Sequence, residues 1–325
     1  MERDLIVSSS PHIRIDSGTR GIMADVLIAL VFPLGLATFL FGPRVPILAA
    51  LSIGSCILFE WLYRKLLKKN NTIGDMSAAV TGLLLTLTLP ASVPYWMPVV
   101  GAFFAIVVVK QLFGGLGQNF MNPALAARAF LFSWPAAMTT WPEHGVIVPL
   151  WGADAVSVAT PLNQLKAGEV TGLSLPDLFV GQTAGSIGEL SVILLLLGGA
   201  YLVVRGVIKP TIPLAFIATV AALTFIFAPS REVALTFMLG HVLSGGLILG
   251  AVFMATDYST SPVTRVGQIL FGIGCGALTV FIRFFGALPE GVCYAILIMN
   301  VLAWLLDKAG RPGVFGKLRR KREKA

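Results

Sequence analysis

Charged residues are scarce in this chain, and their scarcity excludes an ordinary water-soluble protein. Asp, Glu, Lys and Arg make up 12% of the 325 residues, whereas 56% are hydrophobic and the mean hydropathy is +0.85. A soluble globular domain carries about 25% charged residues. The composition therefore indicates an integral membrane protein.

Cysteine is also scarce, and chemical motifs that depend on it are missing. Cys56, Cys275 and Cys293 lie apart in apolar segments, without a CxxC or Cys/His spacing, so neither a disulfide framework nor a metal cluster is predicted. A signal peptide is missing as well, because residues 1–20 lack its short apolar core and cleavage site. We expect these residues to begin a cytoplasmic tail.

Apolar segments fill most of the remaining chain. About ten approach the length needed to cross some 30 Å of hydrocarbon. The third and fifth are short, which indicates inner segments whose ends are satisfied by protein or by a cavity. The ten predicted segments are Ile22 to Phe41, Val45 to Leu67, Met76 to Leu89, Pro94 to Phe113, Pro123 to Ser133, Glu189 to Ile208, Ile212 to Ala228, Val233 to Ala255, Val266 to Phe285 and Gly291 to Leu306.

The distribution of Lys and Arg predicts the orientation in the membrane. With both termini in the cytoplasm, 19 of the 24 basic residues fall on the inner side, as the positive-inside rule requires. The net charge of +8 follows from this topology, and lipid headgroups explain the basic C-terminal tail better than nucleic acid does. The exceptions are Arg44, Lys166, Arg231 and Arg283 outside and Arg128 within a span.

A faint internal repeat predicts the architecture. Gly82, Thr88 and Pro94 of the third segment recur at the same spacing as Gly250, Thr256 and Pro262 of the eighth. These two segments are five spans apart, and an odd offset makes them cross the membrane in opposite directions. The predicted fold class is therefore an all-α membrane protein with an inverted five-plus-five repeat. The predicted parts are a cytoplasmic tail (1–21), a first repeat (22–133), an outer loop (134–188), a second repeat (189–307) and a basic cytoplasmic tail (308–325).

The outer loop contains the polar stretch DAVSVATPL, from Asp154 to Leu162. Its hydroxyl groups leave three interpretations open: a turn that bonds its own backbone, a nucleophile, or a covalent attachment point. A nucleophilic triad is disfavoured, because His144 is the only histidine nearby and no GxSxG motif is present.

The same stretch resembles a known modification motif. Asp-x-x-Ser-x-Ala-Thr is similar to the flavinylation motif D-G-x-[ST]-G-A-T. The stretches FGGLGQNFMNPALAARAFLFSWP, GSIGE, FMATDYSTSP and PEGVCYAILIMN resemble, in the same order, the D subunits of Rnf electron transport complexes. They are also similar to the related B subunits of sodium-pumping NADH:quinone oxidoreductases. Those subunits are the alternative, and the short N-terminal tail of this chain favours the Rnf subunits over them.

The resemblance implies a cofactor and a residue that carries it. A flavin transferase would join FMN through its phosphate to the hydroxyl of Thr160, with Ser157 and Asp154 completing the motif. Ala155 and Val158 stand where the usual motif has glycines, but neither position supplies the hydroxyl. The implied function is electron transfer through covalent FMN, coupled to Na⁺ or H⁺ transport, in a ferredoxin:NAD oxidoreductase complex of the prokaryotic cell membrane. The coupling ion and the direction of electron flow stay open.

The resemblance also implies partners. They are other membrane subunits, a second flavinylated subunit and iron-sulfur subunits. Because this chain lacks an NAD fingerprint and cluster ligands, it is expected to be catalytically incomplete alone.

A second cofactor region is suggested around the fifth segment. Asn122 is suited to cap a helix that begins at Pro123. Arg128 follows at membrane depth, where a charge is costly and is expected to face a partner, the path of a cofactor phosphate or water. Gly114 and Gly115 precede them and serve either close packing or a quinone or second-flavin region. Asp257 either ends the eighth span or binds a non-covalent riboflavin or a coupling cation.

Other ionisable residues have ordinary interpretations. Glu189 and Glu232 lie near span ends, and we expect their side chains to reach water. His241 lies deeper and is expected to be a hydrogen-bonded packing residue, with a proton relay as the alternative.

A different class of protein also fits the apolar pattern. Short helices in inverted repeats are typical of solute channels and transporters. Covalent flavin distinguishes an electron-transfer subunit from a channel or transporter, because solute transport does not require a redox cofactor.

The topology is testable with reporter fusions. A reporter that is active only outside the cell, fused after residue 160, should be active, and the same reporter after residue 67 should be silent, because the Lys-rich and Arg-rich segments are retained inside. Activity of a cytoplasmic reporter at residue 160 would overturn this orientation.

Overall fold

The computed structural model describes residues 18–151, 157–168, 174–181, 183–286 and 290–310. These residues form helices joined by turns and loops, without any strand among them. The first half contains α1 (Thr19–Phe41), α2 (Arg44–Leu66), η1 (Ile73–Asp75), α3 (Ser77–Leu87), α4 (Trp96–Phe103), η2 (Phe104–Gln111) and α5 (Pro123–Leu131).

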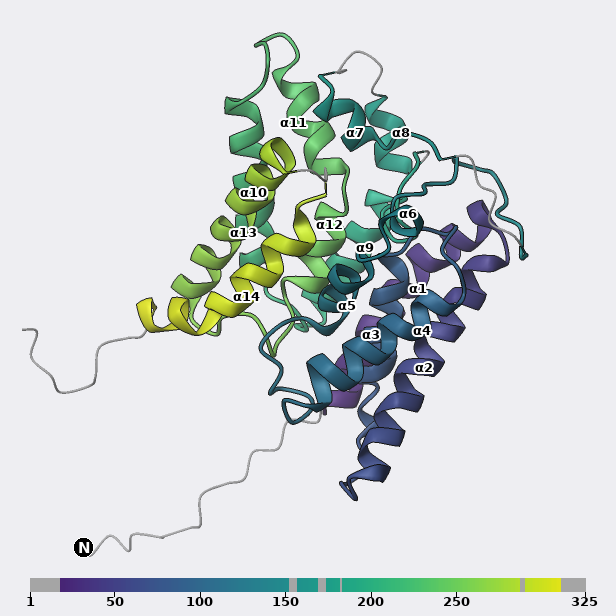
Figure 1. The fold of residues 1–325 in the computed structure, drawn as a ribbon. Helices are drawn as coiled ribbons and strands as arrows, with labels where there is room; N and C mark the ends of the chain where they lie inside the picture. Colours follow the sequence, from purple (N-terminus) through teal and green to yellow (C-terminus); the bar gives the residue numbers. More distant parts are fainter. Residues whose placement is uncertain (1–17, 152–156, 169–173, 182, 287–289, 311–325) are drawn as a thin grey trace, which may run out of the picture.

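Residues 134–188, the predicted outer loop, contribute three short helices before the second half begins (Figure 1). They are α6 (Pro135–Met138), α7 (Pro161–Lys166) and α8 (Leu175–Val180). The second half contains α9 (Val192–Val204), α10 (Thr211–Ile226), α11 (Ala234–Leu243), α12 (Leu247–Leu249), η3 (Gly250–Met254), α13 (Arg265–Phe285) and α14 (Val292–Ala309).

Helical structure occurs within all ten predicted apolar segments, but the helices differ in length. Among the described residues, α1, α2, α13 and α14 are long and apolar enough to cross a membrane. The eighth segment is not one straight helix, because α11 and the α12–η3 unit meet at a bend of 57°. Two adjacent glycines with left-handed φ, Gly245 and Gly246, cause this break. Shorter apolar helices occupy the other segments, namely α3, α4 with η2, α9 and α10.

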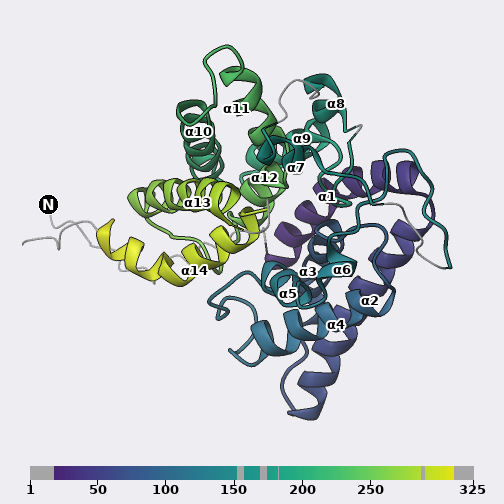
Figure 2. The same ribbon diagram turned by 45° about the horizontal axis from the view of Figure 1, so that its top comes forward.

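The two halves repeat the same packing. Figure 2 shows α1 to α5 on one side and α10 to α14 on the other. In each half the second helix packs against both the third and the fourth, and the fourth packs against the fifth. Thr88 and Thr256 each follow a short inner helix and donate a hydrogen bond to a carbonyl of its last turn. These recurring features support the predicted internal repeat.

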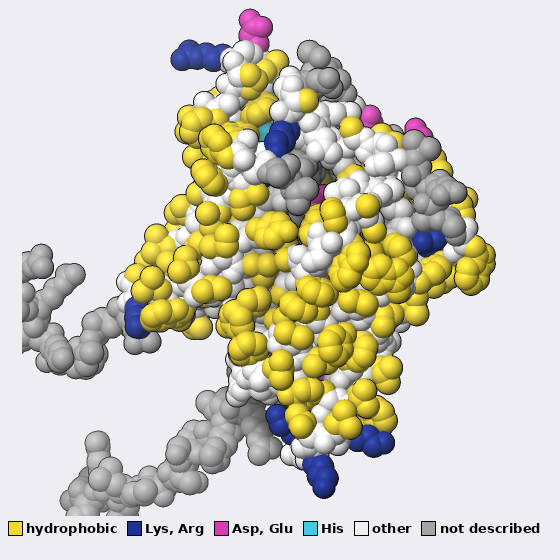
Figure 3. Space-filling view, viewed as in Figure 1, with side chains coloured by type: hydrophobic (Ala, Val, Ile, Leu, Met, Phe, Trp, Pro, Cys, Tyr) yellow, Lys and Arg dark blue, Asp and Glu magenta, His cyan; other side chains and the backbone are white. Residues whose placement is uncertain are grey.

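The short helices lie innermost, as the sequence predicts. Almost every residue of α3, α12 and η3 is buried, and these helices share one hydrophobic core with α1, α5, α9, α13 and α14. The exposed faces of α2 and α14 are apolar instead, with Trp61, Leu66 and Trp304 among their exposed side chains. Figure 3 shows this wide hydrophobic surface, with few Lys and Arg on it and several of them at the lower edge of the view. Such a surface suits a lipid environment.

One buried ion pair joins the helices of the first half. Nζ of Lys110, on η2, donates to Oε2 of Glu60 at 2.8 Å and to Oγ of Ser77 at 2.6 Å. Thr72 donates to the other carboxylate oxygen at 2.6 Å. Because η2 is π-helical, its wider turn is of the kind that often aims a side chain at a functional site.

Candidate functional site

Thr160 lies at the start of α7, where it caps the helix. Its backbone is extended, its Oγ1 accepts a hydrogen bond from the N–H of Asn163 at 3.4 Å, and Pro161 occupies the first helical position. This is the arrangement that a Thr-Pro start favours. The residue is only 6% exposed, so its hydroxyl is enclosed in this conformation.

The rest of the predicted attachment motif is tied to the preceding loop. Ser157 is exposed, donates to the carbonyl of Thr139 and accepts from the N–H of Trp141, both at 3.3 Å. The N–H of Val158 donates to the carbonyl of Trp141 at 3.0 Å. Asp154 and Ala155 lie outside the described residues. The loop thus holds residues 157–158 in place while Thr160 turns into the protein.

Thr160 lines a small pocket with two carboxylates, which we name the Thr160 pocket. It is lined by Thr160, Leu162, Glu189, Ser244, Gly245 and Glu290, among others. These residues come from α7, from the loop before α9, from the break after α11 and from the segment before α14. Residues far apart in sequence therefore meet beside the predicted attachment point.

Arg128 pairs with one of these carboxylates. Its guanidinium forms an ion pair with Glu290, and the two side chains are 8% and 13% exposed. The prediction that a charge at this depth needs a partner is confirmed. The partner is one that sequence reasoning missed, although Glu290 stands in the stretch PEGVCYAILIMN.

Glu189 differs from its sequence expectation. It does not reach out to water, because its Oε1 is buried and lacks a hydrogen-bond partner among the described residues. Its Oε2 accepts weakly from the N–H of Ser186 at 3.4 Å. A Cβ added to Gly246 would lie 2.5 Å from Oε1, so the glycine at the helix break allows the carboxylate to approach closely.

Arg283 contacts the end of α11 at the same helix break. It is 1% exposed, and it donates to the carbonyls of His241 and Ser244, the latter at 3.0 Å. These carbonyls belong to the last turn of α11, which has no continuing helix to satisfy them. The arginine on α13 therefore caps the broken helix, a role that sequence reasoning missed.

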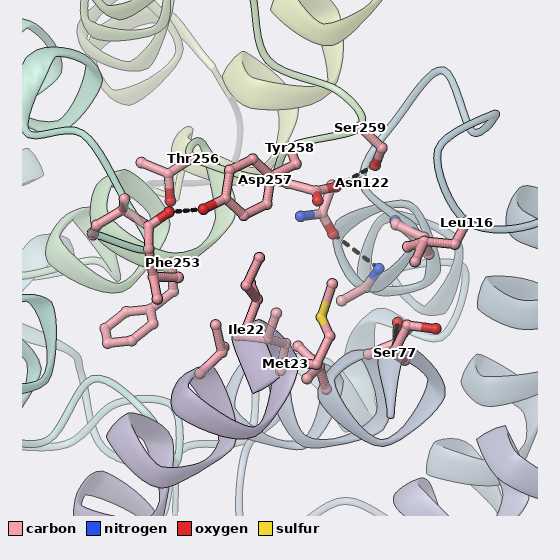
Figure 4. A pocket seen from close by; sticks show the side chains of 18 of the residues that line it. Ile22, Met23, Ser77, Leu116, Asn122, Phe253, Thr256, Asp257, Tyr258 and Ser259 are labelled. Atoms are coloured by element: carbon pink, nitrogen blue, oxygen red, sulfur yellow. Dashed lines mark hydrogen bonds between the residues drawn. The ribbon is translucent and has the colours of Figure 1, made fainter. Parts of the chain in front are cut away.

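A second cavity lies between the two halves, at the other end of α5, and we name it the central cavity (Figure 4). Asn122 and the 256–259 segment line one side, and Ile22 and Met23 of α1 line the opposite side. The cavity brings together Asn122 and Asp257, two of the predicted residues. Lys110 and Asn119 also line it, and neither was predicted.

Asn122 joins the halves of the protein at this cavity. Its Oδ1 caps α5 by accepting from the N–H groups of Ala124 and Leu125, at 3.0 and 3.3 Å. Its Nδ2 donates at 3.3 Å to the carbonyl of Met254, the last residue of η3. The predicted N-cap is confirmed, and the same side chain fixes α5 to the second half.

Asp257 accepts local hydrogen bonds at the cavity wall. Its Oδ2 accepts from the hydroxyls of Ser259 at 2.9 Å and Thr260 at 3.3 Å. Burial raises the pKa of Asp257 above its ordinary value, while these hydrogen bonds oppose the rise. Asn119, at the same cavity, has an unused hydrogen-bond acceptor. It is 4% exposed, and its Oδ1 lacks a partner among the described residues.

The remaining predicted residues are not brought into one site. Arg128 pairs with Glu290, which lines the Thr160 pocket. Asn122 and Asp257 line the central cavity instead. Gly114 and Gly115 adopt left-handed φ values of 121° and 107°, which only glycine adopts readily. Neither lines the central cavity, although Leu116 of the same turn does.

The Arg128–Glu290 pair gives a stability prediction. Arg128→Leu leaves Glu290 unpaired near Glu189, and removal of one partner of a buried pair costs about 3–5 kcal/mol. We expect a clearly lower unfolding temperature of the detergent-purified protein. The double variant Arg128→Leu with Glu290→Gln should recover most of the lost unfolding temperature, because it leaves no unpaired charge at residue 290. Equal melting of Arg128→Leu and wild type would show that the pair contributes no stability.

Comparison with known proteins places the chain in a family. The model described as the NQR2, RnfD, RnfE family matches residues 6–316. The D subunit of the Na⁺-translocating ferredoxin:NAD⁺ oxidoreductase complex of Acetobacterium woodii is 47% identical, over 99% of this chain and 98% of that protein.

Two further relatives are also similar to this chain over nearly its whole length. The D subunit of the proton-translocating ferredoxin:NAD⁺ oxidoreductase complex of Clostridium ljungdahlii is 42% identical, over 96% of each chain. The D subunit of the ion-translocating oxidoreductase complex of Escherichia coli is 34% identical, over 95% of this chain and 98% of that protein. The helical membrane fold, the order of its motifs and these full-length similarities show that the chain belongs to the NQR2, RnfD, RnfE family.

Proposed function

We propose that this chain is the flavin-carrying membrane subunit of an ion-translocating ferredoxin:NAD oxidoreductase complex. Electrons pass through FMN joined to Thr160, and their transfer is coupled to Na⁺ or H⁺ transport. The observation that carries the proposal is the position of Thr160, at the start of α7 beside a pocket with charged walls. The names of the full-length relatives support membership of such a complex.

The hydroxyl of Thr160 fits a phosphoester. Its oxygen accepts one long hydrogen bond, and no described group accepts from its O–H. The cap is therefore the main interaction to be released when a transferase gains access, and loss of an N-cap costs about 1 kcal/mol. Access to the buried side chain also requires the first turn of α7 to move, and Leu162 of that turn is buried.

The protein's own residues would set the environment of the flavin. When bound, FMN supplies one-electron and two-electron transfer, while the protein supplies position and electrostatics. The two carboxylates of the Thr160 pocket are balanced by Arg128, through Glu290, and by Arg283 at the helix break. A flavin phosphate on Thr160 would thus lie in a region with charges of both signs.

The central cavity is the place we propose for a second ligand, a non-covalent riboflavin or a coupling cation. Its polar groups suit either, because Asn119 offers a buried acceptor without a partner and Asp257 a carboxylate. Its volume is about 80 Å³, so a flavin ring requires side chains to move, whereas a cation does not.

Partners follow from the proposed function. They are the other membrane subunits, a second flavinylated subunit, the iron-sulfur subunits and a flavin transferase for maturation. The coupling ion does not follow from similarity, since one relative is named Na⁺-translocating and the other proton-translocating. Ferredoxin-dependent NAD reduction by the purified complex, with and without Na⁺, distinguishes the two ions.

Two substitutions at Thr160 test the attachment. Thr160→Asn keeps a good N-cap but has no hydroxyl, and Thr160→Val keeps the volume but has neither the hydroxyl nor the cap. Both proteins, produced with a flavin transferase, should insert into the membrane and carry no FMN. The measurement is mass spectrometry of the peptide around DAVSVATPL, which in the wild type should gain the mass of FMN less one water.

The controls separate the hydroxyl from the loop. Ser174→Ala removes a hydroxyl of the same loop outside the motif, one that makes no side-chain cap hydrogen bond, and should keep the modification. Thr160→Ser should keep the cap and accept FMN at a reduced level. Flavin fluorescence of the protein band after denaturing electrophoresis also separates an electron-transfer subunit from a channel. An unmodified wild-type peptide would refute the proposed function.

A further inference from the structure

A separate cavity lies beside α7, and we name it the outer aromatic cavity. Its volume is about 280 Å³, near the lower end of the range for small-molecule pockets, about 300 Å³. Its lining includes Leu162, Leu165, Phe227, Phe237, His241 and Phe284. They come from α7, from the end of α10, from α11 and from α13.

Its wall is aromatic and largely apolar. The rings of Phe237 and Phe284 are 6.2 Å apart, Phe227 lies 6.3 Å from Phe284, and the His241 ring lies 4.5 Å from Phe237. Aromatic walls of this kind favour a flat conjugated ligand, which can stack or meet ring edges.

His241 brings an unused hydrogen-bond donor to this wall. The ring is 2% exposed, and its Nδ1 lies 3.4 Å from Nη1 of Arg283. Because a guanidinium only donates, Nδ1 is the acceptor and the proton lies on Nε2. Nε2 lacks a partner among the described residues, and a buried donor without an acceptor costs about 1–3 kcal/mol. Nε2 is itself enclosed, so a ligand with acceptor atoms would remove that cost after a small rotation of the imidazole ring toward the cavity.

Arg283 adds a buried positive charge and a second unused donor. It lines the same cavity, and its Nε lacks a partner among the described residues. The cavity therefore favours a flat ring that has acceptor atoms along one edge and gains negative charge. The isoalloxazine ring of a flavin has this chemistry, because its carbonyl oxygens and N1 accept hydrogen bonds and its two-electron reduced form can be an anion.

The cavity is within reach of Thr160. Leu162 lines both the Thr160 pocket and the outer aromatic cavity, and two residues of chain span at most about 7 Å. FMN has a five-carbon ribityl chain and a phosphate between its ring and the attachment oxygen, which is longer than that span. The Thr160 pocket itself has a volume of about 20 Å³, too small for the ring.

We propose that the outer aromatic cavity receives the isoalloxazine ring of an FMN carried on Thr160. His241 is the hydrogen-bond donor to the ring, and Arg283 favours its reduced, negatively charged form. The inference rests on the proposed attachment at Thr160, and it adds the site where the ring is held.

The test measures the midpoint potential of the covalent flavin in the full-length protein, produced with a flavin transferase. The spectrum of Thr160→Val is subtracted to remove any non-covalent flavin. His241→Phe should keep FMN on Thr160 by mass but lower its midpoint potential, because the reduced ring loses a donor. A tenfold loss of stabilisation of the two-electron reduced form corresponds to about 30 mV. His241→Gln retains an N–H donor and should lie closer to wild type.

The chain offers a matched control. His144 lines a neighbouring cavity with Glu143, Ala159 and Pro161, so His144→Phe makes the same change where we place no ring. Its potential should equal that of wild type. A shift in His144→Phe with none in His241→Phe would overturn the proposal and place the ring in that neighbouring cavity.

A second measurement needs no variant of the cavity. Iodide should quench the fluorescence of the wild-type covalent flavin several-fold less than that of free FMN, because the ring is enclosed. Equal quenching would overturn the cavity assignment even if His241→Phe failed to accumulate. Wild-type peptide without FMN refutes the proposed function itself, whereas modified peptide with full quenching refutes the cavity alone.

Discussion

The constraint on which this structure depends is that helices broken inside a membrane must still satisfy their backbone groups. α3 ends at Leu87, within the core, and the N–H groups of Ile187 and Gly188 bond to the carbonyls of Leu89 and Leu87 at 3.0 and 2.7 Å. α11 ends at the glycine break, and there the guanidinium of Arg283 bonds to the free carbonyls. One break is thus closed by backbone from the outer loop, and the other by a side chain from α13.

The groups that close the breaks also create the candidate site. The 185–189 segment that closes α3 brings Glu189 to the pocket beside Thr160, and the glycines that break α11 leave room for its carboxylate. Arg283, which closes α11, also lines the outer aromatic cavity with His241. A protein built from continuous helices would have neither the free carbonyls nor the space. The site is therefore a consequence of the helix breaks, and its charges have structural roles as well as the proposed functional ones.

Sequence reasoning predicted the features that depend on local chemistry or on composition. The apolar segments, the inward position of the short ones, the Asn122 cap and the need of Arg128 for a partner all follow from propensity and from the cost of buried charge. Contacts between the halves could not be predicted this way. Nothing in one sequence pairs Arg128 with Glu290, or Arg283 with the end of α11, because these contacts join segments more than 35 residues apart through tertiary packing. The buried position of Thr160 was missed for the same reason.

Backbone geometry also bears on the departure of the loop from the usual flavinylation motif. A glycine is required by conformation only where φ lies in the left-handed region, and among the described residues the non-glycine positions with positive φ are Lys68 and Met76. Val158 is not one of them. Its N–H donates to the carbonyl of Trp141, and its side chain is partly exposed. The valine therefore fits this loop without strain.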